Sequence, residues 1–162
     1  MRYAQIRSMD ISNGKGIGVS LFVQGCLFHC KECFNPETWN FDGGKEWTEH
    51  TEKYFLALMD KPYIKRISIL GGEPFAPENY KTVLELCSKI KQEYPDKQIW
   101  VYTGYKYEDL DFSLTTDIDI LVDGQFEINN KDLNLQFYGS SNQRIIDVKK
   151  TIEQNEIITI DL

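Results

Sequence analysis

Three cysteines near the amino terminus are the residues best suited to chemistry. Cys26, Cys30 and Cys33 have the spacing CxxxCxxC and directly follow the apolar run 19–23. Three thiolates at this spacing can hold three irons of a four-iron, four-sulfur cluster, and no nearby fourth cysteine completes the usual set. One iron then stays open to a substrate, whereas structural metal sites are normally closed. The spacing therefore predicts a chemically active iron–sulfur centre.

The same cysteines leave a zinc site open as an alternative. Together with His29 they could form a Cys₃His site, since short CxxC spacings commonly bind zinc. Zinc gives no reason, however, for the glycine-rich segment 71–74 further along the chain. His29 alone is expected to be a loop residue close to the cluster, because three thiolates already suffice.

That glycine-rich segment is the second candidate for chemistry. Gly71, Gly72 and Glu73 follow the short apolar run 67–70, which is typical of a buried strand. A Gly-Gly pair alone more often marks an ordinary turn. Glycines also lack a Cβ atom, so the backbone at the end of a strand can approach a ligand closely. The cysteine motif upstream favours this second interpretation.

In this order, the two motifs resemble the signature of the radical S-adenosylmethionine (SAM) enzymes. The resemblance implies that the three cysteines bind a [4Fe-4S] cluster whose open iron chelates the amino and carboxylate groups of SAM. It also implies that Gly71, Gly72 and Glu73 contact the methionine part of SAM. The implied fold is α/β, a partial (βα)₆ barrel with a mostly parallel sheet, open on one side. A full eight-unit barrel typically takes ~250 residues, more than this chain has.

Further segments resemble one family within this group, the activating proteins of anaerobic, class III ribonucleotide reductases. The similarity runs from about residue 10 to 144 and rests on the segments 13–16, 35–39, 99–105, 122–126 and 139–143. The implied reaction starts when reduced flavodoxin or ferredoxin gives one electron to the cluster. SAM is then cleaved to methionine and a 5′-deoxyadenosyl radical, which takes an α-hydrogen from a glycine on the large catalytic subunit of the reductase.

Two alternatives remain beside this family. One keeps the radical SAM centre but changes the substrate, as in pyruvate formate-lyase activase or 7-carboxy-7-deazaguanine synthase. The other is a non-enzymatic iron–sulfur or zinc module. Many radical SAM proteins carry an aromatic residue just before the third cysteine, whereas this chain has Glu32 there and Phe34 afterwards. The resemblance also departs at Gly18, where an arginine is frequent.

Four more residues are expected at the cofactor. The backbone around Glu32 and Phe34 is a plausible surface for the adenine of SAM. Thr103 and Asp123 follow two predicted strands, and in such barrels polar groups at the strand ends face the site. Each is also followed by glycine, so an ordinary turn is the alternative for both.

The predicted elements alternate between strands and helices, which indicates a parallel sheet with right-handed crossovers. Thr48 is expected to cap the first helix, and Pro77 to lie in the first turn of the second. The predicted strands are 18–24, 66–70, 98–102 and 117–122; the helices run from Thr48 to about Met59, from Pro77 to about Tyr94, and over 107–110; a cluster loop covers 25–36; and a terminal helix or strand falls within 144–162.

Composition limits the remaining possibilities. The 162 residues, 41% of them hydrophobic, are expected to form one domain, 1–162, with one core. A net charge of −7 disfavours nucleic acid as a partner. We expect no signal peptide and no membrane span, and a reducing cytoplasm that keeps the cysteines as thiols. Cys87 lies on the apolar face of a predicted helix and is expected in the core.

Overall fold

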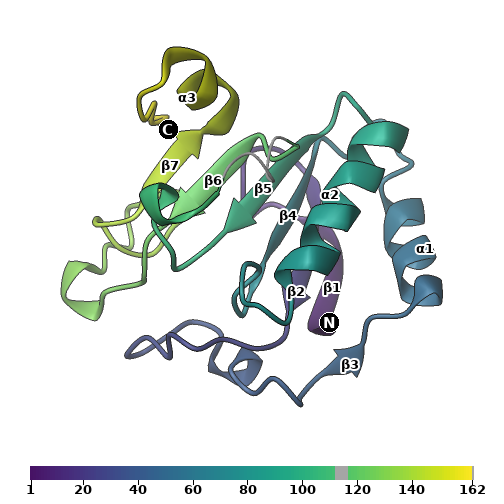
Figure 1. The fold of residues 1–162 in the computed structure, drawn as a ribbon, viewed down its shortest axis with the longest axis horizontal. Helices are drawn as coiled ribbons and strands as arrows, with labels where there is room; N and C mark the ends of the chain where they lie inside the picture. The colour runs from purple at the N-terminus through teal and green to yellow at the C-terminus, as the bar shows by residue number, and fades with distance from the viewer. Residues whose placement is uncertain (112–116, 162) are drawn as a thin grey trace.

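The computed structural model describes residues 1–111 and 117–161 (Figure 1). Its strands are β1 (Arg2–Asp10), β2 (Gly18–Val23), β3 (Lys45–Glu46), β4 (Arg66–Gly71), β5 (Gln98–Tyr102), β6 (Ile120–Asp123) and β7 (Arg144–Asp147). Within the described residues they form one seven-stranded sheet in the order β3-β1-β2-β4-β5-β6-β7. Neighbours among β2, β4, β5 and β6 pair in parallel, whereas β1 and β7 pair antiparallel to the outer two of these. The fold is α/β, with an open mixed sheet around a parallel centre.

Two helices cover one face of this sheet, α1 (Glu49–Leu58) and α2 (Tyr80–Glu93) (Figure 1). A third, α3 (Val148–Gln154), follows the edge strand β7. Short 3₁₀ helices in the described connections are η1 (Pro36–Thr38), η2 (Tyr107–Asp109) and η4 (Ile128–Asn130). No helix within residues 1–111 and 117–161 is long and apolar enough to cross a membrane.

Side-chain alternation along the strands gives the sheet two different faces. On β2, Leu21 packs into the core beneath α1 and α2, whereas Ser20 and Phe22 point to the other face. On β5, Val101 joins the same core, whereas Tyr102 lines a pocket. The helix-covered face therefore holds the main core, and the opposite face is free to form a site.

Most of the predicted elements are confirmed. The predicted strand 98–102 matches β5, and those at 18–24 and 66–70 match β2 and β4 within one residue. Thr48 caps α1, since its side chain accepts a hydrogen bond from the backbone N–H of Thr51. Cys87 lies in the core at 1% exposure. The apolar runs and the capping signal thus determined these elements locally.

Pro77 does not begin the second helix as predicted, because a turn precedes it. The backbone N–H groups of Asn79 and Tyr80 both donate to the Ala76 carbonyl, and α2 begins only at Tyr80. The fourth predicted strand also begins later, at Ile120, as β6. The terminal segment contains both a strand, β7, and a helix, α3, where only one had been expected.

The antiparallel strand β1 was not predicted. β1 carries mixed polar and apolar residues, and its middle is half-buried or exposed, so it lacks a clear apolar pattern. β1 is held in the sheet by pairing with β2, its neighbour in the sequence. The register of this pairing is irregular. A (βα)₆ barrel remains a prediction, since the described strands form an open sheet.

Candidate functional site

The cluster loop begins where β2 ends and folds back on the segment that contains η1. The Gly25 N–H donates to the Thr38 carbonyl at 2.7 Å, and the Cys26 N–H donates to the Trp39 carbonyl at 3.1 Å. Gly25 has a φ of 104°, and a Cβ atom there would overlap the ring of Phe41. A glycine at this position therefore lets the chain turn sharply out of the sheet just before the first cysteine.

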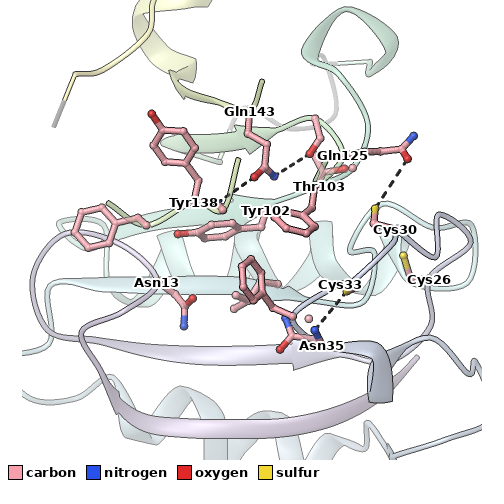
Figure 2. Close-up of a pocket in the computed structure, with 18 of the residues that line it drawn as sticks. Asn13, Cys26, Cys30, Cys33, Asn35, Tyr102, Thr103, Gln125, Tyr138 and Gln143 are labelled. Carbon is pink, nitrogen blue, oxygen red and sulfur yellow. Dashed lines mark hydrogen bonds between the residues drawn. The ribbon is translucent and has the colours of Figure 1, made fainter. Parts of the chain in front are cut away.

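Within the loop, two non-glycine residues take left-handed backbone conformations. His29 has a φ of 47° and Glu32 a φ of 57°. The ring of His29 stacks on that of Trp39, with centroids 4.5 Å apart and an interplanar angle of 10°. His29 is thus a loop residue beside the cysteines, as expected. The Asn35 N–H donates to the Cys33 sulfur at 3.3 Å (Figure 2), the kind of contact that tunes iron–sulfur clusters.

The Gly71–Glu73 segment lies directly alongside the start of this loop. The Gly72 N–H donates to the Val23 carbonyl at 2.9 Å, and the Glu73 N–H donates to the Gly25 carbonyl at 2.7 Å. A Cβ atom at Gly72 would overlap the Gly25 carbonyl, and one at Gly71 would lie 2.8 Å from the Cα of Phe22. The glycines are therefore required because the β4 backbone packs tightly against β2 and the cluster loop.

Glu73 connects the ends of β4 and β5. Its carboxylate accepts hydrogen bonds from the Phe75 N–H at 2.8 Å, the Thr103 hydroxyl at 2.8 Å and the Gly104 N–H at 2.7 Å. The side chain is buried, and burial raises the pKa of Glu73 to about 7, although these three hydrogen bonds oppose the shift. Thr103 therefore belongs to the site through Glu73.

These parts meet in a single pocket of about 490 Å³ (Figure 2). Cys26, Cys30 and Cys33 lie at one side of the pocket. Its lining also includes the predicted residues Phe34, Gly71, Gly72, Glu73 and Thr103. A volume of this size is typical of pockets that bind small molecules and cofactors. The structure thus brings most of the predicted site residues together.

The three thiols suit a cluster better than a single ion. All three are free and half-buried. Burial raises the pKa of the Cys26 and Cys30 thiols, a shift that bound metal overcomes because a coordinating thiol is deprotonated. Among the described residues, no group of three or more His, Cys, Asp or Glu side chains converges on one metal-ion position. A cubane would suit this arrangement, since each thiolate would hold a different iron.

Two predicted residues lie outside the pocket lining. Glu32 is exposed, and its contact with adenine stays a prediction. Asp123 is buried at 1% exposure, and its carboxylate pairs with Arg144 at 2.5 Å and accepts from the Tyr107 N–H at 2.8 Å. These contacts join β6 to β7 and to η2. A contact between Asp123 and a cofactor likewise stays a prediction.

Within the wall formed by residues 124–143, only the segment 139–143 was considered from the sequence, either as a polar loop or as part of the SAM or partner surface. The side chain of Gln143 holds it together: Oε1 accepts from the Gly139 N–H at 3.2 Å, and Nε2 donates to the Gly124 carbonyl at 3.0 Å. Gln125 lies beside the cysteines, with its Oε1 4.0 Å from the Cys30 sulfur. In the sequence, the glycines and the amide side chains of this segment were the features that could have indicated a role at the pocket. The aromatic and apolar side chains that it adds to the lining are Phe126, Leu133, Leu135, Phe137 and Tyr138.

The far side of the pocket was also missed. Figure 2 shows Asn13 and Tyr102 here, with the Tyr102 hydroxyl pointing away from the cysteines. Arg7 adds a cation, with its guanidinium 4.5 Å from the centre of the Phe22 ring. Arg7 belongs to β1, so this side could not be predicted without that strand.

Comparisons with known proteins agree with this site. Residues 12–146 match the family described as a 4Fe-4S single cluster domain, which supports an iron–sulfur cluster as the group bound here. An anaerobic ribonucleoside-triphosphate reductase-activating protein from Vibrio cholerae serotype O1 is 41% identical over 150 residues, which cover 90% of this chain and 97% of the relative.

Proteins of the same name from Enterobacteria phage T4 and Escherichia coli K12 are 38% and 40% identical. These matches cover 90% and 88% of this chain, and 93% and 96% of the relatives. The chain therefore belongs to the family of anaerobic ribonucleoside-triphosphate reductase-activating proteins.

Proposed function

We propose that this protein is a radical SAM enzyme that activates the catalytic subunit of an anaerobic ribonucleotide reductase. Once reduced by flavodoxin or ferredoxin, the cluster supplies the electron that cleaves SAM to methionine and a 5′-deoxyadenosyl radical, which abstracts an α-hydrogen from a glycine of that subunit. The proposal places the reaction in a reducing cytoplasm, in one domain of residues 1–162. The names of the relatives support the partner.

One observation carries the proposal: three thiols and the ends of two parallel strands line the same pocket. Cys26, Cys30 and Cys33 would each hold one iron and leave the fourth open. In parallel sheets, ligands bind beyond the carboxyl ends of the strands, where Gly71 and Thr103 lie. The arrangement supports a cofactor that Gly71 and Thr103 at these strand ends would hold beside the cluster.

The chain's own residues would orient SAM and exclude water. We assign the methionine part of SAM to the backbone of Gly71, Gly72 and Glu73, which lies beside the cluster loop. The Glu73 carboxylate is held rigidly by its three hydrogen bonds and presents a buried acceptor. We assign the adenine to the backbone near Phe34, whose ring packs against Phe126 with centroids 4.8 Å apart.

Two features support a protein substrate. The sheet is open, so its pocket face is accessible to a protein segment in the way that a partial (βα)₆ barrel, open on one side, would be. Exposed apolar side chains occur close to the site in sequence, including Leu27 at 67%, Phe34 at 57% and Leu133 at 85% exposure. Exposed apolar groups of this kind are typical of surfaces that contact other proteins.

The experiment that tests this function combines two measurements in one anaerobic reaction. The reconstituted, reduced protein is mixed with SAM and the organism's anaerobic reductase subunit. Electron paramagnetic resonance then detects a glycyl radical, and chromatography measures 5′-deoxyadenosine. We expect both products in matching amounts, and we expect the Cys30→Ala protein to yield neither.

The other outcomes identify the alternatives. Deoxyadenosine without a glycyl radical would retain the SAM chemistry and reject this substrate, in favour of another activase or a small synthase. A well-formed cluster with neither product would favour an electron-transfer module. Zinc in place of iron after anaerobic purification would reject the cluster itself.

A further inference from the structure

Arg66 is a fully buried cation that lies beneath the pocket without lining it. It begins β4 and pairs in register with Gly18 of β2. A Cβ atom at Gly18 would lie 2.6 Å from Arg66 Cγ, and one at Gly14 would lie 2.6 Å from Arg66 Cδ and Nε. The arginine side chain therefore passes across two glycines, which leave the space that it fills.

The guanidinium is connected to one edge of the pocket by a chain of hydrogen bonds. Nη2 donates to the Asp10 carbonyl at 2.7 Å, and Nη1 donates to the Ser68 hydroxyl at 2.7 Å. The Ser68 hydroxyl in turn donates to the Asn13 carbonyl at 2.6 Å. Arg66 thus holds both ends of the segment that follows β1.

The Asp10 carboxylate organises the same segment from within. It accepts hydrogen bonds from the Ser12 N–H at 2.7 Å, from the Asn13 side chain at 2.6 Å, and from the Ser20 hydroxyl. The carboxylate lies 3.7 Å from Arg66 Nη2. Burial raises the pKa of Asp10, but these hydrogen bonds and the charge of Arg66 outweigh it and lower the pKa below its usual value. The pair is therefore a buried, ionised brace.

The segment that this brace holds forms the side of the pocket away from the cysteines. Ser12 and Asn13 both line the pocket, and Figure 2 shows Asn13 on the opposite side from the three thiols. A cofactor anchored at the thiols would occupy the cysteine side. The Ser12–Asn13 edge would then face the space left for the molecule that donates hydrogen.

We infer that Arg66 is a positioning residue, which fixes the Ser12–Asn13 edge so that the hydrogen-donating segment of the partner protein can dock against it. The inference rests on the proposed function. Hydrogen transfer requires the reacting atoms at a distance of ~3–3.5 Å, so a small displacement of this edge lowers productive docking. Arg66 acts through Asp10 and Ser68 and does not contact the substrate.

The test uses Arg66→Met, which removes the cation, and Ser68→Ala, which keeps the cation but removes the hydroxyl that accepts from Arg66 and donates to the Asn13 carbonyl. With either variant, we expect the catalytic-subunit concentration for half-maximal glycyl radical formation to rise about tenfold. The dissociation constant for SAM and the iron content should stay unchanged. In the iron-free protein, hydrogen exchange of the Ser12 amide should become about tenfold faster with Arg66→Met, because its acceptor Asp10 loses its brace.

The matched control is Lys91→Met, which breaks the 2.6 Å ion pair with Asp119 on the helix-covered side of the molecule. This variant should lower the melting temperature without changing the catalytic-subunit concentration for half-maximal glycyl radical formation. If Arg66→Met and Ser68→Ala behave like this control, Arg66 is only a structural residue and the inference is wrong. Weaker SAM binding in these variants would also overturn it.

The proposed function can fail separately. Binding of the catalytic subunit to the iron-loaded protein, measured directly by calorimetry, does not depend on radical formation. A wild-type protein that binds the subunit but forms no deoxyadenosine would reject the proposed function. Unchanged binding of the subunit by both variants would then reject the role of Arg66 as well, and about tenfold weaker binding would retain it.

Discussion

The two faces of the central sheet are built from the same strands but differ in chemistry. The face under α1 and α2 carries Leu21, Ile67 and Val101, all at 0% exposure in one apolar core. The other face carries Ser20 and Ser68 among its buried residues, together with an arginine, aromatic rings and a pocket. Parallel sheets normally bury both faces under helices. Here one face provides stability, and loops with polar groups make the other available for binding.

The polar face also contains unsatisfied groups. Within the described residues, the buried atoms without a hydrogen-bond partner are Arg66 Nε, Tyr102 Oη and Trp39 Nε1. Each belongs to a residue of the pocket face or the cluster region, and buried polar atoms without partners cost free energy. The site is thus built at some expense of stability, which the apolar face offsets. The following predictions test this division.

The largest effect is expected when the same substitution, cysteine to alanine, is compared between the pocket and the core. Cys30→Ala should abolish cluster assembly and deoxyadenosine formation, because it removes one of three iron ligands. Cys87→Ala, on the buried side of α2, should keep both and lower the free energy of unfolding by about 1 kcal/mol. Iron content and thermal unfolding distinguish the two. A cluster-bearing, active Cys30→Ala protein would reject the ligand assignment.

Phe55→Ala should reduce stability more than any change in the pocket wall. Phe55 is at 0% exposure between α1 and the sheet, so its truncation should cost about 3–5 kcal/mol. Phe34→Ala, at 57% exposure in the pocket wall, should cost less than about 1 kcal/mol. Urea denaturation of the iron-free proteins measures both. Equal losses of stability in the two variants would contradict the conclusion that the helix-covered face provides most of the stability.

Glu73 should make the stability of the iron-free protein depend on pH. Its pKa is raised from 4.5 to about 7 on folding, so the folded state holds a proton that the unfolded state releases. Relative to Glu73→Gln, the contribution of Glu73 is therefore fully present below pH 4.5 and is lost as the pH rises to about 7. The loss is a few kcal/mol at most, at about 1.4 kcal/mol per pKa unit.

Unfolding of both proteins between pH 4.5 and 8 provides the measurement. A constant stability difference across this range would show that the Glu73 pKa is not raised. Thr103→Val should move the pH at which this stability is lost to a higher value. Thr103 donates a hydrogen bond that stabilises the ionised carboxylate, so its removal raises the pKa of Glu73 further.

The smallest expected effect distinguishes two tyrosines. Tyr102→Phe removes a buried hydroxyl that has no partner among the described residues, so it should leave stability unchanged or raise it by about 1 kcal/mol. Tyr94→Phe removes a hydroxyl that donates to the Leu56 carbonyl at 3.2 Å, and should lower stability by about 1 kcal/mol. Thermal unfolding compares them. A destabilised Tyr102→Phe protein would mean that its hydroxyl is bonded in solution.

Local patterns determined much of this protein. The run 19–23, the run 67–70 and the segment 98–102 predicted β2, β4 and β5, because buried strands of a parallel sheet are continuously apolar. The spacing of Cys26, Cys30 and Cys33 predicted the iron–sulfur site, which the family match supports. Short-range chemistry of this kind is present in the sequence itself.

Only the tertiary structure decided which distant residues meet. β1 was missed because its mixed polar and apolar residues give no clear apolar pattern, and the wall of residues 124–143 is held by amide hydrogen bonds that leave no periodic signal. Gly18 is the clearest case. The space beside Gly18 is filled from the neighbouring strand by the side chain of Arg66. This packing depends on the register of the two strands, which the sequence alone does not determine.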